Sequence, residues 1–186
     1  MNITAEQSAE MQRRLNEGRA RRLVSAAVDM FTDVKPKSKE APAIVIGIDP
    51  GTNTGFAEVF LGKLLFVQTV SIYEALRRVE NCDREFSGQV LVRFEDARLR
   101  QWFGKSGTEK WKGAGSIMRD CAIWEETLTA LGIPFEKVPP KEVKETTAEY
   151  FRKLTGWTGR TSIHAREAAW LVLPYLKNIG TKDAIS

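Results

Sequence analysis

The stretch from Ala43 to Gly55, AIVIGIDPGTNTG, restricts the possible fold more than any other part of the chain. Residues 43–48 are almost continuously apolar, which is the pattern of a strand buried on both faces. Asp49 follows at once, and the Pro-Gly and Thr-Gly pairs after it are typical of a sharp turn. Burying a carboxylate at the end of a central strand is costly unless it is paired or binds a metal. The stretch therefore predicts either a functional Asp49 or an aspartate that only caps a turn.

A second apolar run ends in the same way. Residues 89–94, QVLVRF, lead directly into Glu95 and Asp96. Two hydrophobic strands that each deliver a carboxylate near the end favour one shared acidic site over an isolated turn cap.

Apolar periodicity and turn signals predict a mixed α/β protein with a five-stranded sheet flanked by helices. The domain is expected over residues 43–178, after an N-terminal helix and basic linker (1–42) and before a short tail (179–186). The N-terminal helix is either a solvated helix that docks on the domain or a basic arm for a phosphate backbone. The expected strands are 43–49, 56–61, 64–70, 90–95 and 134–138, with a tight hairpin at Gly62-Lys63, and the expected helices are 72–81, 115–131, 141–154 and 162–177.

The helix 115–131 carries an apolar stripe on one face. We expect this stripe to form a homodimer interface, although it would also serve to cover the sheet. Its members are Ile117, Cys121, Trp124 and Leu128.

The charge and composition of the chain indicate what kind of molecule it binds. The net charge of +4 and the isoelectric point near 9.1 favour an anionic partner such as nucleic acid. No apolar run approaches the roughly 20 residues of a membrane span, and no signal peptide opens the sequence. Cys82 and Cys121 lack the spacing of a metal site, so we expect reduced cysteines in a cytoplasmic protein with no membrane partner.

The last predicted helix opens with HAREAA, in which His164 and Glu167 are three residues apart and share one helix face. Each has a simple explanation by itself: a surface histidine, and a glutamate that complements the helix dipole. Together with Asp49 and Glu95 they make a cluster suited to Mg²⁺ or Mn²⁺, with hard oxygen ligands and one imidazole.

Four motifs in order, IGIDPGTNTG, VLVRFE, PPKEVK and HAREAA, resemble those of the RuvC-type Holliday junction resolvases, and within them the phage-encoded branch. The resemblance covers roughly residues 43–176 and leaves the N-terminal helix outside. It implies an RNase H-like fold, a homodimer, and metal-dependent cleavage of two strands of a four-way DNA junction, with two Mg²⁺ or Mn²⁺ ions per active site. A phage-encoded member would act in the cytoplasm of a bacterial host.

The resemblance also implies roles for single residues. By position, Asp49, Glu95 and Glu167 match the family's metal carboxylates, and His164 matches a position that is Asp or His. Glu167 departs from the family, which usually has Asp there, and adds one methylene to the side chain.

The segment 98–112, RLRQWFGKSGTEKWK, interleaves cations with aromatic residues. Cations contact phosphates and aromatic rings stack on unpaired bases, so the segment predicts a nucleic-acid surface, with Arg98, Trp102 and Phe103 probing an open junction centre. Buried aromatics with lysines outside are the alternative. The candidate DNA contacts are Arg98, Arg100, Trp102, Phe103, Lys105, Lys110 and Lys112, together with Lys141 and Lys144, which a solvated helix start would also explain.

Other functions fit parts of the pattern. DPGTNTG is also similar to the phosphate loop of actin-like ATPases and sugar kinases, but a chain of 186 residues is short for their second lobe. A catalytically silent DNA-structure binder would gain nothing from clustered carboxylates that face phosphates. We therefore expect a junction endonuclease, with a nuclease for other branched or flapped DNA as the second choice.

Overall fold

A computed structural model describes residues 42–100 and 108–177, with side chains from 115 onward in the second range. The chain divides into units 1–40 and 41–186, and all described residues belong to the second. The expected N-terminal helix and C-terminal tail lie outside the described residues. So do Trp102, Phe103 and Lys105, and the side chains of Lys110 and Lys112.

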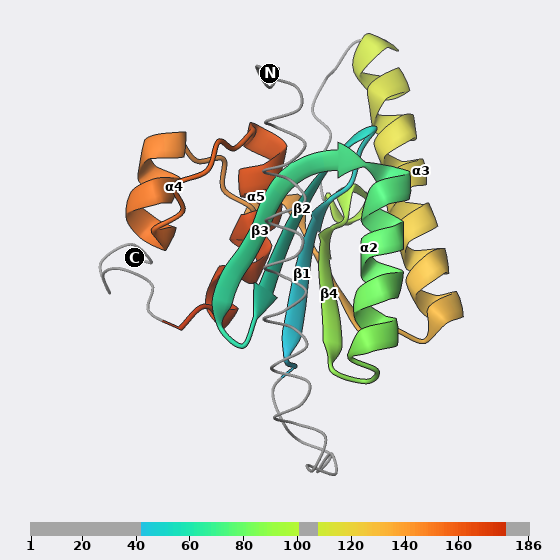
Figure 1. The fold of residues 1–186 in the computed structure, drawn as a ribbon. Helices are drawn as coiled ribbons and strands as arrows, with labels where there is room; N and C mark the ends of the chain where they lie inside the picture. The colour runs from blue at the N-terminus through green and yellow to red at the C-terminus, as the bar shows by residue number, and fades with distance from the viewer. Residues whose placement is uncertain (1–41, 101–107, 178–186) are drawn as a thin grey trace, which may run out of the picture. The chain divides into compact units, whose positions relative to one another are not determined.

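The core of the second unit is a five-stranded sheet in the order β3-β2-β1-β4-β5 (Figure 1). β2 is antiparallel to both β1 and β3, whereas β4 is parallel to β1 and β5. This is the mixed sheet predicted from the sequence and the RNase H-like arrangement that the resemblance implies. The strands are β1 (Ile44–Asp49), β2 (Asn53–Phe60), β3 (Lys63–Ser71), β4 (Val90–Glu95) and β5 (Phe135–Val138).

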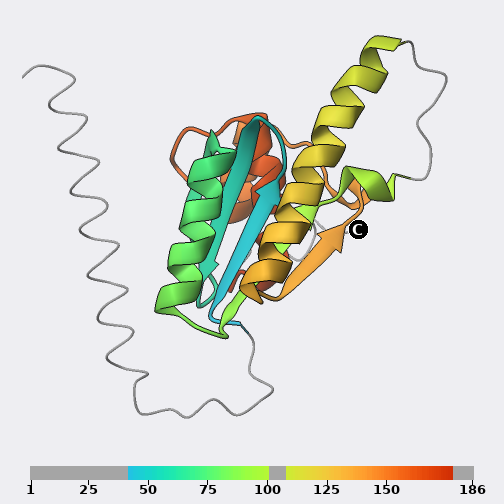
Figure 2. The same ribbon diagram turned by 90° about the vertical axis from the view of Figure 1, so that its right-hand side faces the viewer.

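Helices cover both faces of the sheet. α2 (Ile72–Glu85) and α3 (Thr108–Leu131) lie side by side on one face, while α4 (Ala148–Thr155) and α5 (Ile163–Val172) lie on the other (Figure 2). The alternating side chains of β1 feed two separate clusters: Ile46 packs with the residues of α2 and α3, and Val45 with those of α4 and α5. Among the described helices, none has the length and apolar character needed to cross a membrane.

α5 packs against the sheet at glycines. A Cβ added at Gly47 would lie 2.0 Å from the carbonyl oxygen of Ala168, and one at Gly55 would lie 2.0 Å from that of His164. Such contacts are too short for any side chain. The two glycines therefore let the backbone of α5 rest directly on β1 and β2.

The apolar stripe of α3 covers the sheet. Cys121, Trp124 and Leu128 are each 0% exposed within the domain core, while Ile117 is 41% exposed. The predicted dimer surface on this stripe is therefore wrong for three of its four residues, because the sheet of the same chain already buries them.

Several predicted boundaries also change: β2 begins at Asn53 rather than at 56, α2 ends at Glu85 rather than at 81, and α3 begins at Thr108 rather than at 115. The β2–β3 turn is Leu61-Gly62, with φ of 48° and 85°, one residue earlier than expected. The predicted helix 141–154 is wrong at its start: a 3-10 turn, η2 (Pro140–Glu142), precedes an irregular segment, and α4 begins only after the capping residue Thr147. The last helix gives way at Leu173 to another 3-10 turn, η3 (Leu173–Tyr175).

Candidate metal centre

β1 and β4 deliver Asp49 and Glu95 to the same face of the sheet. The two strands are parallel, and Ile48 pairs with Phe94, so the residues that follow stand side by side at the strand ends. Ile48 and Phe94 point into the core beneath α2 and α3. Because side chains alternate along a strand, Asp49 and Glu95 point to the opposite face, where α5 lies.

The first turn of α5 brings the other two predicted residues. Ser162 caps the helix, since its Oγ accepts the backbone N–H of Ala165 at 3.0 Å. The same oxygen is hydrogen-bonded to the hydroxyl of Thr69 on β3. The cap therefore ties the start of α5 to the sheet and places His164 and Glu167 above the strand ends.

Three of the four side chains form one close group. Nδ1 of His164 lies 2.8 Å from Oδ2 of Asp49 and 3.6 Å from Oε2 of Glu167. One ligand atom from each of these residues lies within 4.8 Å of the other two. Glu95 is outside this group but lies on the same face of the sheet, beside Asp49 at the end of the neighbouring strand.

Burial and the neighbouring negative charges make the carboxyl groups of this cluster harder to ionise. Burial, followed by the charge of Glu167, raises the pKa of Asp49 to about 7, although the hydrogen bond from His164 acts in the other direction. Burial and then Glu167 also raise the pKa of Glu95. A divalent cation would relieve this repulsion, and the oxygen-rich donor set matches the ligands that Mg²⁺ and Mn²⁺ prefer. The residues present therefore fit such an ion.

The predicted basic contacts differ in their surroundings. Arg98 is engaged by two carboxylates: its Nε and Nη2 lie 2.7 Å from Oδ1 and Oδ2 of Asp96, and Nη2 also contacts Glu125. Burial by itself would raise the pKa of Asp96, but the hydrogen bonds from Arg98 more than offset this and hold the pKa below its ordinary value. Arg100 is exposed, and its charge partly offsets the rise in the pKa of Glu95 that burial and Glu167 cause.

Lys141 lies in the turn η2 and Lys144 follows it, and both side chains are exposed. The ammonium of Lys144 is 5.7 Å from the centre of the Trp170 ring on α5. This contact places Lys144 beside the helix that carries His164 and Glu167, while Lys141 stands three residues earlier in the chain.

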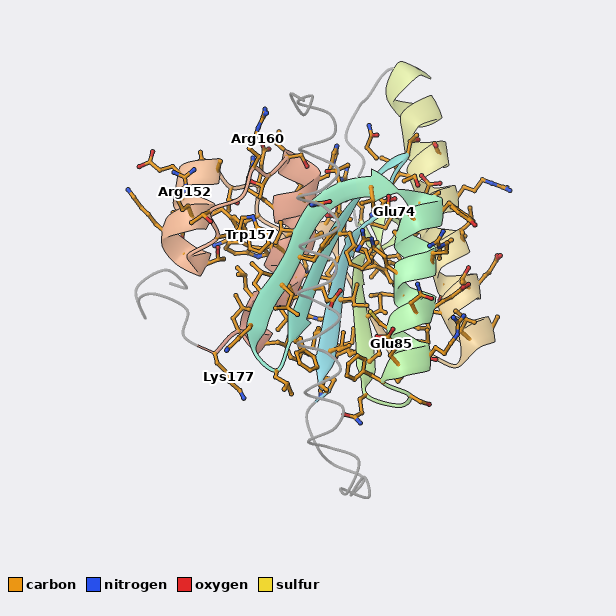
Figure 3. The ribbon with its side chains drawn as sticks, viewed as in Figure 1. Glu74, Glu85, Arg152, Trp157, Arg160 and Lys177 are labelled. Carbon is orange, nitrogen blue, oxygen red and sulfur yellow. The ribbon has the colours of Figure 1, made fainter. Side chains whose placement is uncertain are left out.

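Sequence analysis missed two arginines near α5. Arg166 is only 8% exposed, and it donates to the carbonyl oxygens of Thr146 at 2.6 Å and Thr161 at 3.0 Å, which fixes the segments on either side of α4. A charged residue inside HAREAA, between two predicted ligands, was the available signal. Arg160 is exposed in the loop that leads to α5 and points outward from the domain (Figure 3).

The raised pKa of Asp49 predicts how the stability of the metal-free protein changes with pH. The pKa rises from 3.8 to about 7 on folding, so between these values the folded state holds a proton that the unfolded state has lost. The stabilisation of the folded state by this proton is fully present below about pH 4 and is lost as the pH rises through about 7. As the pH rises from 5 to 8, the wild type loses this contribution and Asp49→Asn does not. We therefore expect the free energy of unfolding of the variant to rise relative to that of the wild type by on the order of 2 kcal/mol over this range. Denaturant unfolding in EDTA measures this, and a difference that does not vary with pH would contradict it.

Comparisons with known proteins give a single kind of match. No protein-family model matches the chain, and no curated protein matches it. Among solved structures, 15 chains match. One of them is T. thermophilus RuvC in complex with a Holliday junction substrate, which is 22% identical with a TM-score of 0.46, over 70% of this chain and 90% of that chain.

Proposed function

We propose that this chain is a metal-dependent endonuclease that cleaves branched DNA, with four-way junctions as the preferred substrate. The observation that carries the proposal is the close group of Asp49, His164 and Glu167, with Glu95 on the same face at the neighbouring strand end. The order of the four motifs along the chain supports a resolvase of the RuvC type. We place the protein in the cytoplasm, of a bacterial host if it is phage-encoded.

Each residue would have a distinct part in phosphodiester hydrolysis. Asp49, Glu95 and Glu167 would hold two Mg²⁺ or Mn²⁺ ions. Such ions, when bound, activate a water molecule and stabilise the leaving oxygen. His164 is 53% exposed and hydrogen-bonded to Asp49 through Nδ1, so it is placed both to orient that carboxylate and to exchange a proton with solvent.

The DNA contacts of this proposal come from the basic and aromatic residues. Arg100, Lys141 and Lys144 would hold phosphates near the metal centre. Trp102 and Phe103 would stack on bases at an opened junction centre, and Lys105, Lys110 and Lys112 would follow the backbone. Paired incision of two strands needs two centres, so we also propose a two-fold homodimer. Its surface must differ from the buried stripe of α3, and light scattering of the purified protein tests it.

Cleavage of defined DNA structures tests the proposed function. Labelled four-way, three-way, flap and linear duplex DNA of matched arm sequence would be incubated with the protein, with Mg²⁺ or with EDTA. We expect incision of the four-way junction in Mg²⁺, much slower incision of the duplex, and none in EDTA. Faster incision of flaps than of four-way junctions would favour the second function, a nuclease for other branched DNA.

The same substrates identify a protein that binds without cutting. Junction binding in EDTA with no incision in either Mg²⁺ or Mn²⁺ would contradict the proposed nuclease. It would leave a DNA-structure binder as the remaining function.

A further inference from the structure

A second carboxylate beside the metal centre points away from it. The backbone of Asp96 continues the extended conformation of β4, so Asp96 projects to the face opposite that of Glu95. Asp96 is 1% exposed, and a carboxylate buried to this extent requires a charged or hydrogen-bonding partner. Asp96 therefore belongs to the side of the sheet that α3 covers.

Arg98 supplies that partner and extends the network. The short 3-10 turn η1 (Ala97–Leu99) folds Arg98 back onto Asp96, which accepts the backbone N–H of Arg98 at 3.0 Å and two guanidinium bonds at 2.7 Å each. Nη2 of Arg98 also contacts Glu125 on α3. The other carboxylate oxygen of Glu125 accepts from Lys137 of β5 at 2.7 Å. Alternating charges thus join the end of β4 to its neighbours α3 and β5.

The peptide group between Glu95 and Asp96 is held by the same two neighbours. Its carbonyl oxygen faces the thiol of Cys121 on α3 at 3.6 Å, and its N–H donates to the carbonyl oxygen of Val138 on β5 at 2.8 Å. The backbone of Glu95 is therefore fixed from the side opposite to the metal centre. The Glu95 side chain points the other way, toward α5.

We propose that Arg98 is a positioning residue for Glu95 rather than a contact for DNA phosphate. It neutralises the buried Asp96 and clamps the end of β4 to α3, and this sets the direction in which Glu95 enters the metal centre. A two-point phosphate contact through Nε and Nη2 would have to displace the carboxylates that already bind these atoms. This role of Arg98 rests on the proposed function only because it requires the metal centre. It differs from the DNA contact that the position of Arg98 in a basic segment suggests.

Mn²⁺ binding to the DNA-free protein tests this proposal by calorimetry, well below the melting transition of each variant. We expect Arg98→Gln to weaken Mn²⁺ binding about tenfold, as loss of a residue that orients a metal ligand does. Arg98→Lys should recover part of that loss because it keeps the charge. Arg77→Gln, at an exposed position of α2, is the matched control and should bind Mn²⁺ as the wild type does.

Junction binding in EDTA separates positioning from phosphate contact. For a positioning residue we expect Arg98→Gln to change junction affinity by less than about threefold and to leave its salt dependence unaltered. The proposal is overturned if Mn²⁺ affinity stays at the wild-type value while junction affinity falls about tenfold and the salt slope becomes shallower by about one unit.

A milder pair of variants covers the case in which Arg98→Gln does not fold. Glu125→Gln keeps the Asp96–Arg98 pair and weakens the links of α3 to Arg98 and to Lys137. We therefore expect Mn²⁺ binding to weaken by about threefold, less than the roughly tenfold loss expected for Arg98→Gln. Glu126→Gln, the exposed neighbour on the same helix, should have no effect. Equal Mn²⁺ affinity for both variants would overturn the positioning role alone. A wild-type protein that binds no Mn²⁺ would overturn the metal centre, and the positioning role with it.

Discussion

Replacing Asp49 by asparagine is expected to lower the rate of junction cleavage by about 10²–10³-fold or more, the loss typical when one group that stabilises transition-state charge is removed. Asn keeps the volume of the side chain and can still accept the hydrogen bond from Nδ1 of His164. It cannot supply the negative charge that would hold a divalent ion beside Glu167. Single-turnover cleavage of a labelled four-way junction in Mg²⁺ measures the effect.

DNA binding should survive the same change. The phosphate contacts proposed above lie on other residues, so junction affinity in EDTA should stay within a few-fold of the wild type. Asp83→Asn on α2, on the opposite face of the sheet, is the matched control and should retain full activity. Cleavage by Asp49→Asn at a substantial fraction of the wild-type rate would remove Asp49 from the centre.

The sheet was predictable because each strand carries its own signal. The apolar run before Asp49 and the run before Glu95 both need burial. The hairpin turns make β3 run in the direction of β1, and the crossover through α2 gives β4 that same direction, so β4 can pair in parallel with β1. The prediction that a helix begins at Lys141 is wrong because tertiary contacts hold residues 142–146 in another conformation. The indole N–H of Trp170 donates to the carbonyl of Glu142, and Arg166 donates to that of Thr146. These distant side chains bind the segment in an irregular conformation, and no local pattern reveals them.

The residues of the candidate site could be selected from the sequence, but the contacts of Arg98 beside it could not. Strand ends and the i, i+3 spacing were enough to select Asp49, Glu95, His164 and Glu167, and the structure places these four on one face. The extra methylene of Glu167 does not remove it from the cluster, since its carboxylate reaches 3.6 Å from His164. The engagement of Arg98 by Asp96 was not predicted, because it depends on the 3-10 turn η1, which folds Arg98 back onto Asp96.

The glycines under α5 lead to the second large effect, which is expected on stability. Gly55→Ala would place its Cβ 2.0 Å from the carbonyl oxygen of His164 and 3.1 Å from Cβ of Asp49. Both contacts involve atoms fixed by the sheet and by the helix backbone, so α5 has to move away from β2. Overpacking of this kind costs about 1–3 kcal/mol and sometimes more, which corresponds to a fall in melting temperature of roughly 2–12 °C for a chain of this size.

The same displacement should separate the ligands. His164 and Glu167 belong to the turn that is pushed outward, whereas Asp49 stays on β1, so Mn²⁺ affinity is expected to fall together with stability. Gly115→Ala is the matched control: a Cβ there meets nothing within 4 Å, and the position is helical, so the variant should gain up to about 1 kcal/mol. Thermal unfolding and Mn²⁺ calorimetry on both variants decide the matter. A Gly55→Ala protein with wild-type melting temperature and Mn²⁺ affinity would show that α5 does not rest on β2 at this glycine, and the placement of His164 over Asp49 would have to be revised.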